Sequence, residues 1–281
     1  MSGGDGLLAH ALKAKMPESV QLHSFTRSEF DLQNPEQMKA RLEEVCPAVL
    51  INTAAYNLVD RCEEERALSW AINATAPETL GRLCADRKIR LVHYGTDYVF
   101  DGKQQTPYRE TDSPNPLNHY AAGKLHGEQA VLKSSPEHLV LRTSWIFGAH
   151  PTQTKTYVHT VLKAARAGKD LKATTDQISV PTYAPDLASW TWAFIEKGAS
   201  GLLHAVNDEP ISRYEWTRAI LAEAFQAGLI DRVPDVEAVT TAYFNSTMKR
   251  PAYSAMDNSK ATAVLGRSLG TWRPGLAEML N

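Results

Sequence analysis

Short apolar runs alternate with longer helical patterns over the first half of the chain, and this alternation restricts the fold more than any other sequence feature. The apolar runs are Val20 to Phe25, Ala48 to Asn52, Ile89 to Gly95 and Leu139 to Thr143. Helix-compatible segments lie between them, at about 35–45, 63–86 and 118–133. Strands that alternate with helices pair in parallel, because each helix crosses over the sheet. The pattern therefore predicts an open, doubly wound α/β sheet.

The second half of the chain has fewer strand signals. Helical patterns lie near 154–167, 184–197 and 212–227, with one short strand at Gly201 to Val206. Ser212 and Glu215 have the spacing of a capping box at the start of the last helix. Too few strands remain for a second full sheet, so we expect a smaller lobe over 151–281 packed on a sheet domain over 1–150, with some interleaving.

Charge and composition exclude several classes of function. The chain has 30 Lys and Arg against 32 Asp and Glu, a net charge of −2, so nothing attracts it generally to nucleic acid or an anionic membrane. Apolar residues make up 43%, which is enough for a sizeable core. No run reaches the roughly 18 to 20 apolar residues of a spanning helix, and the N-terminus lacks signal-peptide regions. We expect a cytoplasmic protein with no nucleic acid or membrane partner.

Cysteines and histidines give no metal or disulfide pattern. Cys46, Cys62 and Cys84 are an odd number of cysteines, at spacings that match neither a disulfide framework nor a zinc site. His93 and His119 have no third ligand at usable spacing. We expect inert thiols, hydrogen-bonded structural histidines and no bound metal.

Tyr120-Ala-Ala-Gly-Lys124 carries the strongest chemical signal. The segment becomes helical after Pro116, and the i, i+4 spacing places the phenol and the ammonium on one helix face. A nearby cation favours the phenolate, so we expect Lys124 to lower the pKa of Tyr120 from about 10 toward working pH. By itself the motif is common, and it also fits a surface Tyr and Lys on an amphipathic helix.

A hydroxyl and a carboxylate follow one of the predicted strands. Thr96 and Asp97 come directly after the strand that ends at Gly95. In open α/β sheets, ligands bind at the carboxyl ends of the strands. Thr96 can donate a hydrogen bond to a substrate oxygen while Tyr120 supplies a proton, as carbonyl reduction requires. The alternatives are a cap at Thr96 and an Asx turn at Asp97.

A glycine-rich turn lies at the N-terminus. Gly3-Gly-Asp-Gly6-Leu7 precedes a helical run and resembles the turn whose backbone amides approach a pyrophosphate. That assignment needs a strand just before the turn, and only Met1 and Ser2 precede it. The first strand, which would be central in the sheet, is therefore expected to be missing or truncated. The alternative is that the first residues are a start-site artefact.

Two further segments follow strand patterns and have the composition of cofactor-binding loops. Arg27 lies where a cation pairs with a ribose 2′-phosphate, and Asp31 lies near the adenine end. A solvated charge cluster explains both residues nearly as well. Ala54 and Ala55 would let the backbone approach a dinucleotide closely, and helix packing explains them almost equally.

Short motifs that are weak one by one form an ordered set along nearly the whole chain. The set includes Asn52-Thr-Ala-Ala-Tyr56, Gly95-Thr-Asp-Tyr-Val-Phe-Asp-Gly102, Tyr120 to Lys124, Arg142-Thr-Ser-Trp145, Asp176-Gln177 and Arg250-Pro251. In this order the motifs resemble the dTDP-4-dehydrorhamnose reductase family of extended short-chain dehydrogenase/reductases. The resemblance implies a Rossmann-like NAD(P)-binding domain over 1–150 and a mainly helical substrate-binding lobe over 151–281.

The resemblance also implies a reaction, namely reduction of the C4 ketone of a dTDP-4-dehydro-6-deoxyhexose by NADPH or NADH. Tyr120 would protonate the ketone oxygen, Lys124 would hold the nicotinamide ribose and tune Tyr120, and Thr96 would polarise the carbonyl. Asp97 and Trp145 match positions that contact the sugar, although Trp145 also fits a core aromatic at a strand end.

The family's cofactor-contacting positions fall on seven residues, to which the patterns above add Gly3 and Arg27. The seven are Gly6, Leu7, Asp31, Leu32, Ala54, Ala55 and Tyr56, with Tyr120 and Lys124 at the nicotinamide. Tyr56 and Asn57 stand where the family commonly has His or Tyr followed by Thr, which leaves the local contact open.

Two other functions stay open at this point. The first is a non-catalytic, partner-binding regulatory subunit, since the β subunit of methionine adenosyltransferase resembles the same family. The second is a related epimerase or dehydratase, although a dehydratase usually carries an acidic pair where this chain has Asp97 followed by Tyr98. The sugar, the preference between NADH and NADPH, and assembly as a homodimer stay open as well.

Overall fold

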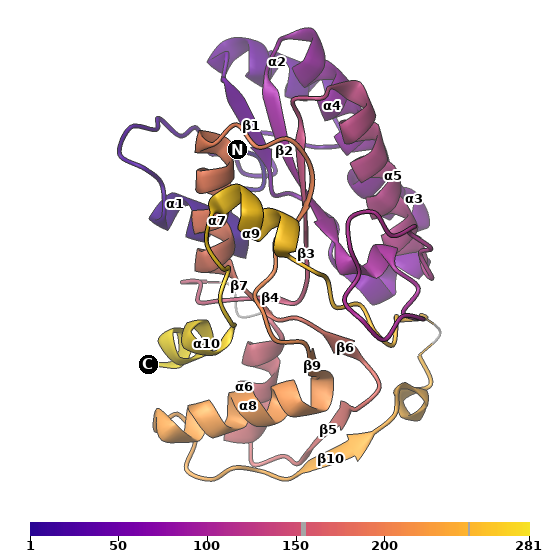
Figure 1. The fold of residues 1–281 in the computed structure, drawn as a ribbon, viewed down its shortest axis with the longest axis vertical. Coiled ribbons are helices and arrows are strands. Elements are labelled where there is room, and N and C mark those ends of the chain that lie inside the picture. The colour runs from indigo at the N-terminus through magenta and orange to yellow at the C-terminus, as the bar shows by residue number, and fades with distance from the viewer. Residues whose placement is uncertain (153–155, 247) are drawn as a thin grey trace.

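A four-stranded, entirely parallel sheet forms the centre of the upper lobe of the computed structural model, which describes residues 1–152, 156–246 and 248–281 (Figure 1). The strand order is β1 (Val49–Asn52), β2 (Arg90–Thr96), β3 (Leu139–Thr143) and β8 (Gly201–His204). These four strands coincide with four of the predicted strand segments to within two residues at each end. The predicted parallel sheet is confirmed.

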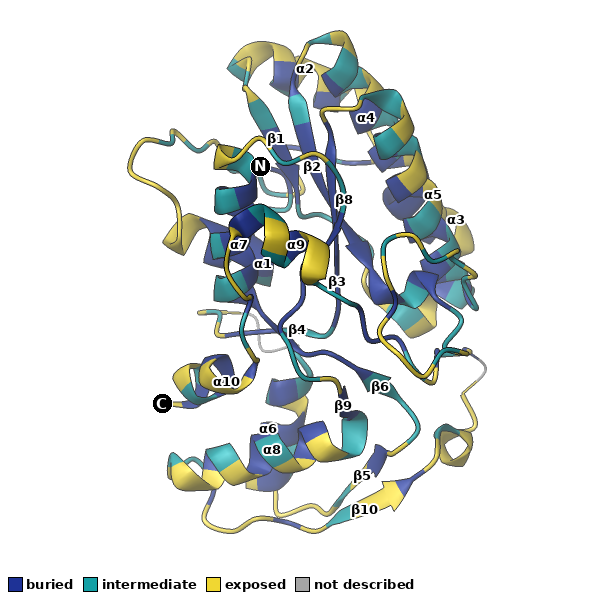
Figure 2. Ribbon diagram, in the orientation of Figure 1, coloured by how far each residue is buried: buried dark blue, intermediate teal, exposed yellow. Residues whose placement is uncertain are grey.

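Helices cover both faces of this sheet, as a doubly wound fold requires. One layer contains α2 (Pro35–Val45), α4 (Ala76–Asp86) and α5 (His119–Ser134), and the other contains α1 (Leu7–Ala14), α7 (Ala184–Glu196) and α9 (Ser259–Leu265). Side chains alternate along the strands, so Leu50 and Leu91 pack into the first layer, whereas Ile51 and Val92 pack into the second. Exposed residues lie on the outward sides of the helices (Figure 2).

Met1 and Ser2 form a stub of the first strand. Ser2 makes a parallel bridge with Asn52, and its N–H donates to the Ile51 carbonyl at 3.1 Å. On the other side, the Met1 carbonyl accepts from the Phe25 N–H at 2.9 Å. The first strand is therefore present as this short stub, which lies in the expected central position beside β1.

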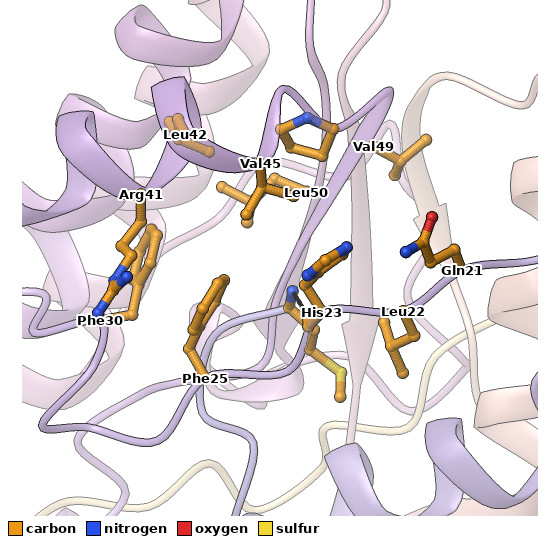
Figure 3. A pocket seen from close by; sticks show the side chains of 12 residues that line it. Gln21, Leu22, His23, Phe25, Phe30, Arg41, Leu42, Val45, Val49 and Leu50 are labelled. Carbon is orange, nitrogen blue, oxygen red and sulfur yellow. Dashed lines mark hydrogen bonds between the residues drawn. The ribbon is translucent and has the colours of Figure 1, made fainter.

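The strand predicted at Val20 to Phe25 is wrong, because this run has no strand assignment in the structure. A strand needs hydrogen-bond partners along its length, and the stub provides them only at His23 and Phe25. Beyond the stub, a cavity of about 60 Å³ separates this run from β1 and α2 (Figure 3). The apolar side chains Val20 and Leu22 still pack on the core, which explains the misleading pattern.

The helix predicted over 63–86 is divided in the structure. A 3₁₀ turn (Val59–Glu63), α3 (Arg66–Trp70) and a π-helical turn (Ala71–Thr75) precede α4. The Asn73 side chain in the π turn exchanges two hydrogen bonds with the Tyr56 backbone, at 2.9 and 3.0 Å. The interruption thus fixes the loop that follows β1.

The second lobe is built on helices with short strand pairs. It contains α6 (Tyr157–Arg166), α8 (Arg213–Gln226) and α10 (Arg273–Leu280), and the parallel pair β5 (Leu171–Thr174) with β10 (Val236–Val239). Two smaller pairs are β4 (Ile146–Phe147) with β7 (Thr182–Tyr183) and β6 (Ile178–Ser179) with β9 (Ile211–Ser212). The capping box of Ser212 and Glu215 is present at the start of α8, as predicted.

The chain crosses between the lobes more than once. After the short strands, α7 packs on α1 and β8 joins β3, so 184–204 lies with the main sheet. α8 and α6 then pack together in the lower lobe, and α9 returns to the sheet layer (Figure 1). Of the helices described, none is both long and apolar enough to cross a membrane.

Candidate active site

Thr96 and Tyr120 meet at the carboxyl end of β2. Thr96 is the last residue of β2, and its hydroxyl donates to the Asp97 carboxylate at 3.2 Å. Tyr120 lies in the first turn of α5, where the Asn118 side chain caps the helix by accepting from the Ala121 N–H at 2.9 Å. The cap fixes where α5 begins, and therefore places the phenol beside the strand end.

The Tyr120 phenol is buried, with 9% of the residue exposed. Burial raises its pKa above the ordinary tyrosine value, because the phenolate would lose its hydration, and the side chain of Thr96 offsets part of this increase. The predicted lowering of this pKa by Lys124 is therefore wrong. A phenol that stays protonated at neutral pH is suited to donate a proton.

Lys124 lies one helical turn beyond Tyr120, on the same side of α5, and is 4% exposed. Its ammonium donates to the Tyr94 carbonyl of β2 at 2.6 Å. Burial lowers its pKa to about 8, while the charge of Glu128 acts in the opposite direction. The ammonium is thus held by the sheet backbone, which explains why it does not shift the phenol as predicted.

Asp97 joins the two lobes through a buried carboxylate. Besides Thr96, it accepts from the Ser179 hydroxyl at 2.9 Å and the Ser254 hydroxyl at 2.5 Å. Burial raises the pKa of Asp97 to about 6, although the serine hydroxyls favour the ionised form. Both serines are separated from Asp97 by more than 80 residues, and no local pattern indicated them.

We expect Asp97→Asn to gain stability relative to the wild type as the pH rises from about 4 to about 7. The folded-state pKa lies above the unfolded value of 3.8, so the protonated group contributes stability at low pH that is lost as the pH rises through about 6. The difference in unfolding free energy should change by about 2 kcal/mol between these pH values. Urea unfolding of both proteins at the two pH values measures it, and an unchanged difference would contradict the burial of this charge.

The glycine turn fits closely between the stub and α1. Gly3 has φ of +70°, and a Cβ there would lie 2.8 Å from the Ala54 backbone nitrogen. A Cβ on Gly4 would lie 2.4 Å from the Ser24 hydroxyl. Gly6 follows as the N-cap of α1. The order of strand, glycine turn and helix is therefore present, and the turn touches the loop after β1.

The remaining predicted cofactor residues differ in how far they are buried. Those that are half-buried are Leu7, Asp31, Ala54, Ala55 and Tyr56. Arg27 is exposed in the turn that follows Phe25, with its side chain open to solvent. Leu32 is 7% exposed and packs with Phe30 and Met38 in the core. Leu32 therefore packs in the core, whereas the other predicted residues keep part of their surface exposed.

Trp145 lies where β3 passes into the second lobe. Its backbone has φ of +41°, a conformation that costs a non-glycine residue about 1–3 kcal/mol and is found at functional sites. Its indole stacks on the Arg213 guanidinium, with 3.4 Å between Cζ and the ring centroid. Arg213 was not predicted, because a single arginine after a capping serine carries no recognisable pattern.

His93 and His119 differ in the hydrogen-bond partners of their ring nitrogens. His119 contacts the Arg66 carbonyl through Nε2 at 3.0 Å, as expected of a structural histidine. Buried His93 contacts Asn52 through Nδ1 at 3.1 Å, but its Nε2 has no partner, so its prediction is only half right. Across the part of the chain that the structure describes, His, Cys, Asp and Glu form no cluster able to hold a metal ion.

The site and the fold together define a class of protein. A doubly wound parallel sheet carries a glycine turn before α1, and the buried side chains of Thr96, Tyr120 and Lys124 gather at the carboxyl end of β2. This combination is that of an extended short-chain dehydrogenase/reductase. The RmlD substrate binding domain model matches residues 1–281, and the chain belongs to this family.

Named relatives agree with this assignment. The dTDP-4-dehydrorhamnose reductase of Aggregatibacter actinomycetemcomitans is 32% identical, over 98% of this chain and 96% of its own length. The Mycobacterium tuberculosis protein of the same name is 35% identical, over 100% of this chain and 91% of its own length. The predicted family is therefore confirmed.

Solved structures support the fold. A dTDP-4-dehydrorhamnose reductase from Bacillus anthracis, in complex with NADP, superposes with a TM-score of 0.92 at 28% identity, covering 99% of this chain and 96% of that one. A UDP-glucose 4-epimerase from Thermus thermophilus reaches 0.83 at 17% identity, over 99% and 96% of the two chains, and shows the fold alone. The predicted Rossmann-like fold class is confirmed.

Proposed function

We propose that this protein reduces the C4 ketone of dTDP-4-dehydro-L-rhamnose to give dTDP-L-rhamnose, with NADPH or NADH as reductant. The placement of buried Thr96, Tyr120 and Lys124 at one sheet edge carries the proposal. The names of the relatives support the substrate, and the NADP complex of the Bacillus anthracis structure supports the cofactor.

The cofactor is a group that these residues fit. The turn at Gly3 and Gly4 leaves no room for a Cβ, and its backbone precedes the N-terminus of α1. Gly3, Gly6 and Leu7 would hold the pyrophosphate, while Arg27, Asp31 and Leu32 lie toward the adenosine end. Ala54, Ala55 and Tyr56 would line the middle of the site. When bound, NADPH or NADH supplies the hydride.

The chain's own residues then complete the reduction. Thr96 polarises the ketone through a hydrogen bond to its oxygen, and Tyr120 donates the proton as negative charge develops there. The raised pKa of Tyr120 keeps the phenol protonated until that moment. Lys124, a cation for most molecules at neutral pH with a pKa of about 8, would hold the nicotinamide ribose.

The lobe that follows residue 150 contributes to the sugar site. Trp145 lies at the entry to that lobe beside Arg213, and Asp97 connects to it through Ser179 and Ser254. We assign cofactor binding mainly to 1–150 and sugar binding mainly to 151–281.

The proposal also includes a cytoplasmic location and assembly as a homodimer. Light scattering of the purified protein measures the oligomeric state.

The test is a direct assay. Purified protein is mixed with dTDP-4-dehydro-L-rhamnose and NADPH or NADH, and the loss of nicotinamide absorbance is followed. Substrate-dependent oxidation with formation of dTDP-L-rhamnose is the expected result. No oxidation with either cofactor, together with co-purification of a stable partner protein, would favour the regulatory-subunit alternative instead.

We expect Gly3→Ala to weaken NADPH binding by at least tenfold and to destabilise the fold by about 1–3 kcal/mol. The new Cβ would collide with the Ala54 backbone at 2.8 Å, in addition to the cost of φ at +70°. Gly198→Ala is the matched control, since Gly198 has φ of +67° with nothing within 4 Å of its Cβ position. Fluorescence titration with NADPH measures the affinity of both variants. Equal NADPH affinities of Gly3→Ala and Gly198→Ala would contradict the assignment of the glycine turn to cofactor binding.

A further inference from the structure

Arg213 presents an unpaired positive charge beside the proposed active site. Its guanidinium stacks on two aromatic rings, with Cζ 3.4 Å from the Trp145 centroid and 4.4 Å from the Tyr157 centroid. Stacking uses the faces of the planar group and leaves the N–H donors at its edge free. Among the residues that the structure describes, none accepts a hydrogen bond from this guanidinium or pairs with it.

Two other arginines that are buried or half-buried have carboxylate partners, whereas half-buried Arg90 donates only to backbone carbonyls. Arg142, 2% exposed, forms a bidentate pair with Glu128, and Arg250 pairs with Asp60 at 2.5 Å. Arg213 is half-buried, and burial lowers its pKa from the ordinary arginine value. The Asp97 charge acts on Arg213 but forms no ion pair with it, so an anion that arrives with a ligand would supply the missing hydrogen-bonded partner.

The surroundings hold Arg213 rigidly. The Tyr157 hydroxyl forms a hydrogen bond with Thr217 at 2.7 Å, which fixes one stacking ring. Trp145, the other ring, is held in the left-handed backbone conformation described above. Arg213 is also the first residue of α8, a 14-residue helix whose N-terminus adds a partial positive charge.

Tyr98 connects this cation to the reacting centre. The Tyr98 and Tyr120 rings lie edge to face with centroids 6.1 Å apart. The charges of Arg213 and Arg250 both act on the Tyr98 phenol. Arg213 therefore acts on the same tyrosine that packs against the proposed proton donor.

We propose that Arg213 binds the diphosphate of the nucleotide-sugar substrate and so sets the distance between the sugar ring and Tyr120. This inference rests on the proposed function, in which the sugar carries a nucleoside diphosphate. A planar guanidinium donates two parallel hydrogen bonds to phosphate oxygens, a geometry that lysine does not reproduce. Arg250, whose charge also acts on the Tyr98 phenol, is a second cation for the same diphosphate, although Asp60 competes for it.

Calorimetric titration with dTDP and, separately, with NADP⁺ tests the proposal. We expect Arg213→Gln to weaken dTDP binding by about 10- to 100-fold, which is the effect of losing charge-assisted hydrogen bonds, while NADP⁺ binding stays within about twofold. Arg213→Lys, which keeps the charge without the fork, should fall between Arg213→Gln and the wild type. Arg218→Gln is the matched control, because Arg218 lies on the same helix, is exposed and stacks on Tyr214.

Each outcome bears on the proposal. Equal dTDP affinities of Arg213→Gln, Arg213→Lys and wild type would overturn it, as would a parallel loss of dTDP and NADP⁺ binding, which would indicate general disruption. Turnover by the wild type reports separately on the proposed function. A wild type that binds dTDP in an Arg213-dependent manner but oxidises no NADPH would refute the reductase while leaving the diphosphate site supported.

Discussion

Tyr120→Phe should lower kcat for ketone reduction by about 10²- to 10⁴-fold, the contribution typical of a positioned general acid. The substitution removes only the hydroxyl from a buried ring at the strand end, so the packing against Tyr98 is retained. NADPH affinity and unfolding free energy should therefore change little. Steady-state kinetics with dTDP-4-dehydro-L-rhamnose, combined with NADPH titration, measure both quantities.

Tyr214→Phe provides the matched control for this experiment. Tyr214 lies in the first turn of α8, where its ring faces Arg218, outside the grouping of Thr96, Tyr120 and Lys124. The control should retain wild-type kcat. A Tyr120→Phe enzyme that also keeps wild-type kcat would show that another group or a water molecule delivers the proton, and the assignment of Tyr120 would be lost.

The position of this proposed proton donor could be predicted from the sequence because it depends on local patterns. An i, i+4 pair on a helix and a hydroxyl at a strand end are both short-range patterns, so Thr96, Tyr120 and Lys124 were identified together. The pKa of Tyr120 was not, because burial depends on tertiary packing. The sequence shows that a cation is near, but it does not show how much water has been removed from the phenol.

The same distinction between local pattern and tertiary packing explains the errors in the predicted fold. Leu139–Thr143 was predicted residue for residue, since a buried central strand has partners on both sides. Val20 to Phe25 has an equally apolar pattern, but the neighbouring strand is only a stub, so the ladder cannot form. Ser179, Ser254 and Arg213 reach the site from distant parts of the chain, and contacts of that kind leave no spacing to detect.

Glu128 provides the second large expected effect, because it connects α5, which carries the proposed proton donor, to the sheet. Its carboxylate accepts from the Arg142 guanidinium at 2.6 and 2.9 Å, and both side chains are 2% exposed. The pair fills the space next to Gly95, where a Cβ would lie 2.8 Å from a Glu128 oxygen. Glu128 also lies one helical turn beyond Lys124, two turns beyond Tyr120. The ion pair therefore holds the face of α5 that carries Tyr120 against the sheet.

Glu128→Ala should lower the unfolding free energy by about 3–5 kcal/mol, since it leaves a buried guanidinium without a counterion. Glu43→Ala is the control, because the Glu43–Arg87 pair is largely exposed at the carboxylate and should contribute about 1 kcal/mol or less. Urea unfolding measures both. The double variant Glu128→Leu with Arg142→Met removes both charges and should recover most of the loss, because the main cost comes from the isolated charge and not from the missing attraction. If the double variant were as unstable as Glu128→Ala, the ion pair itself would be what holds α5 on the sheet.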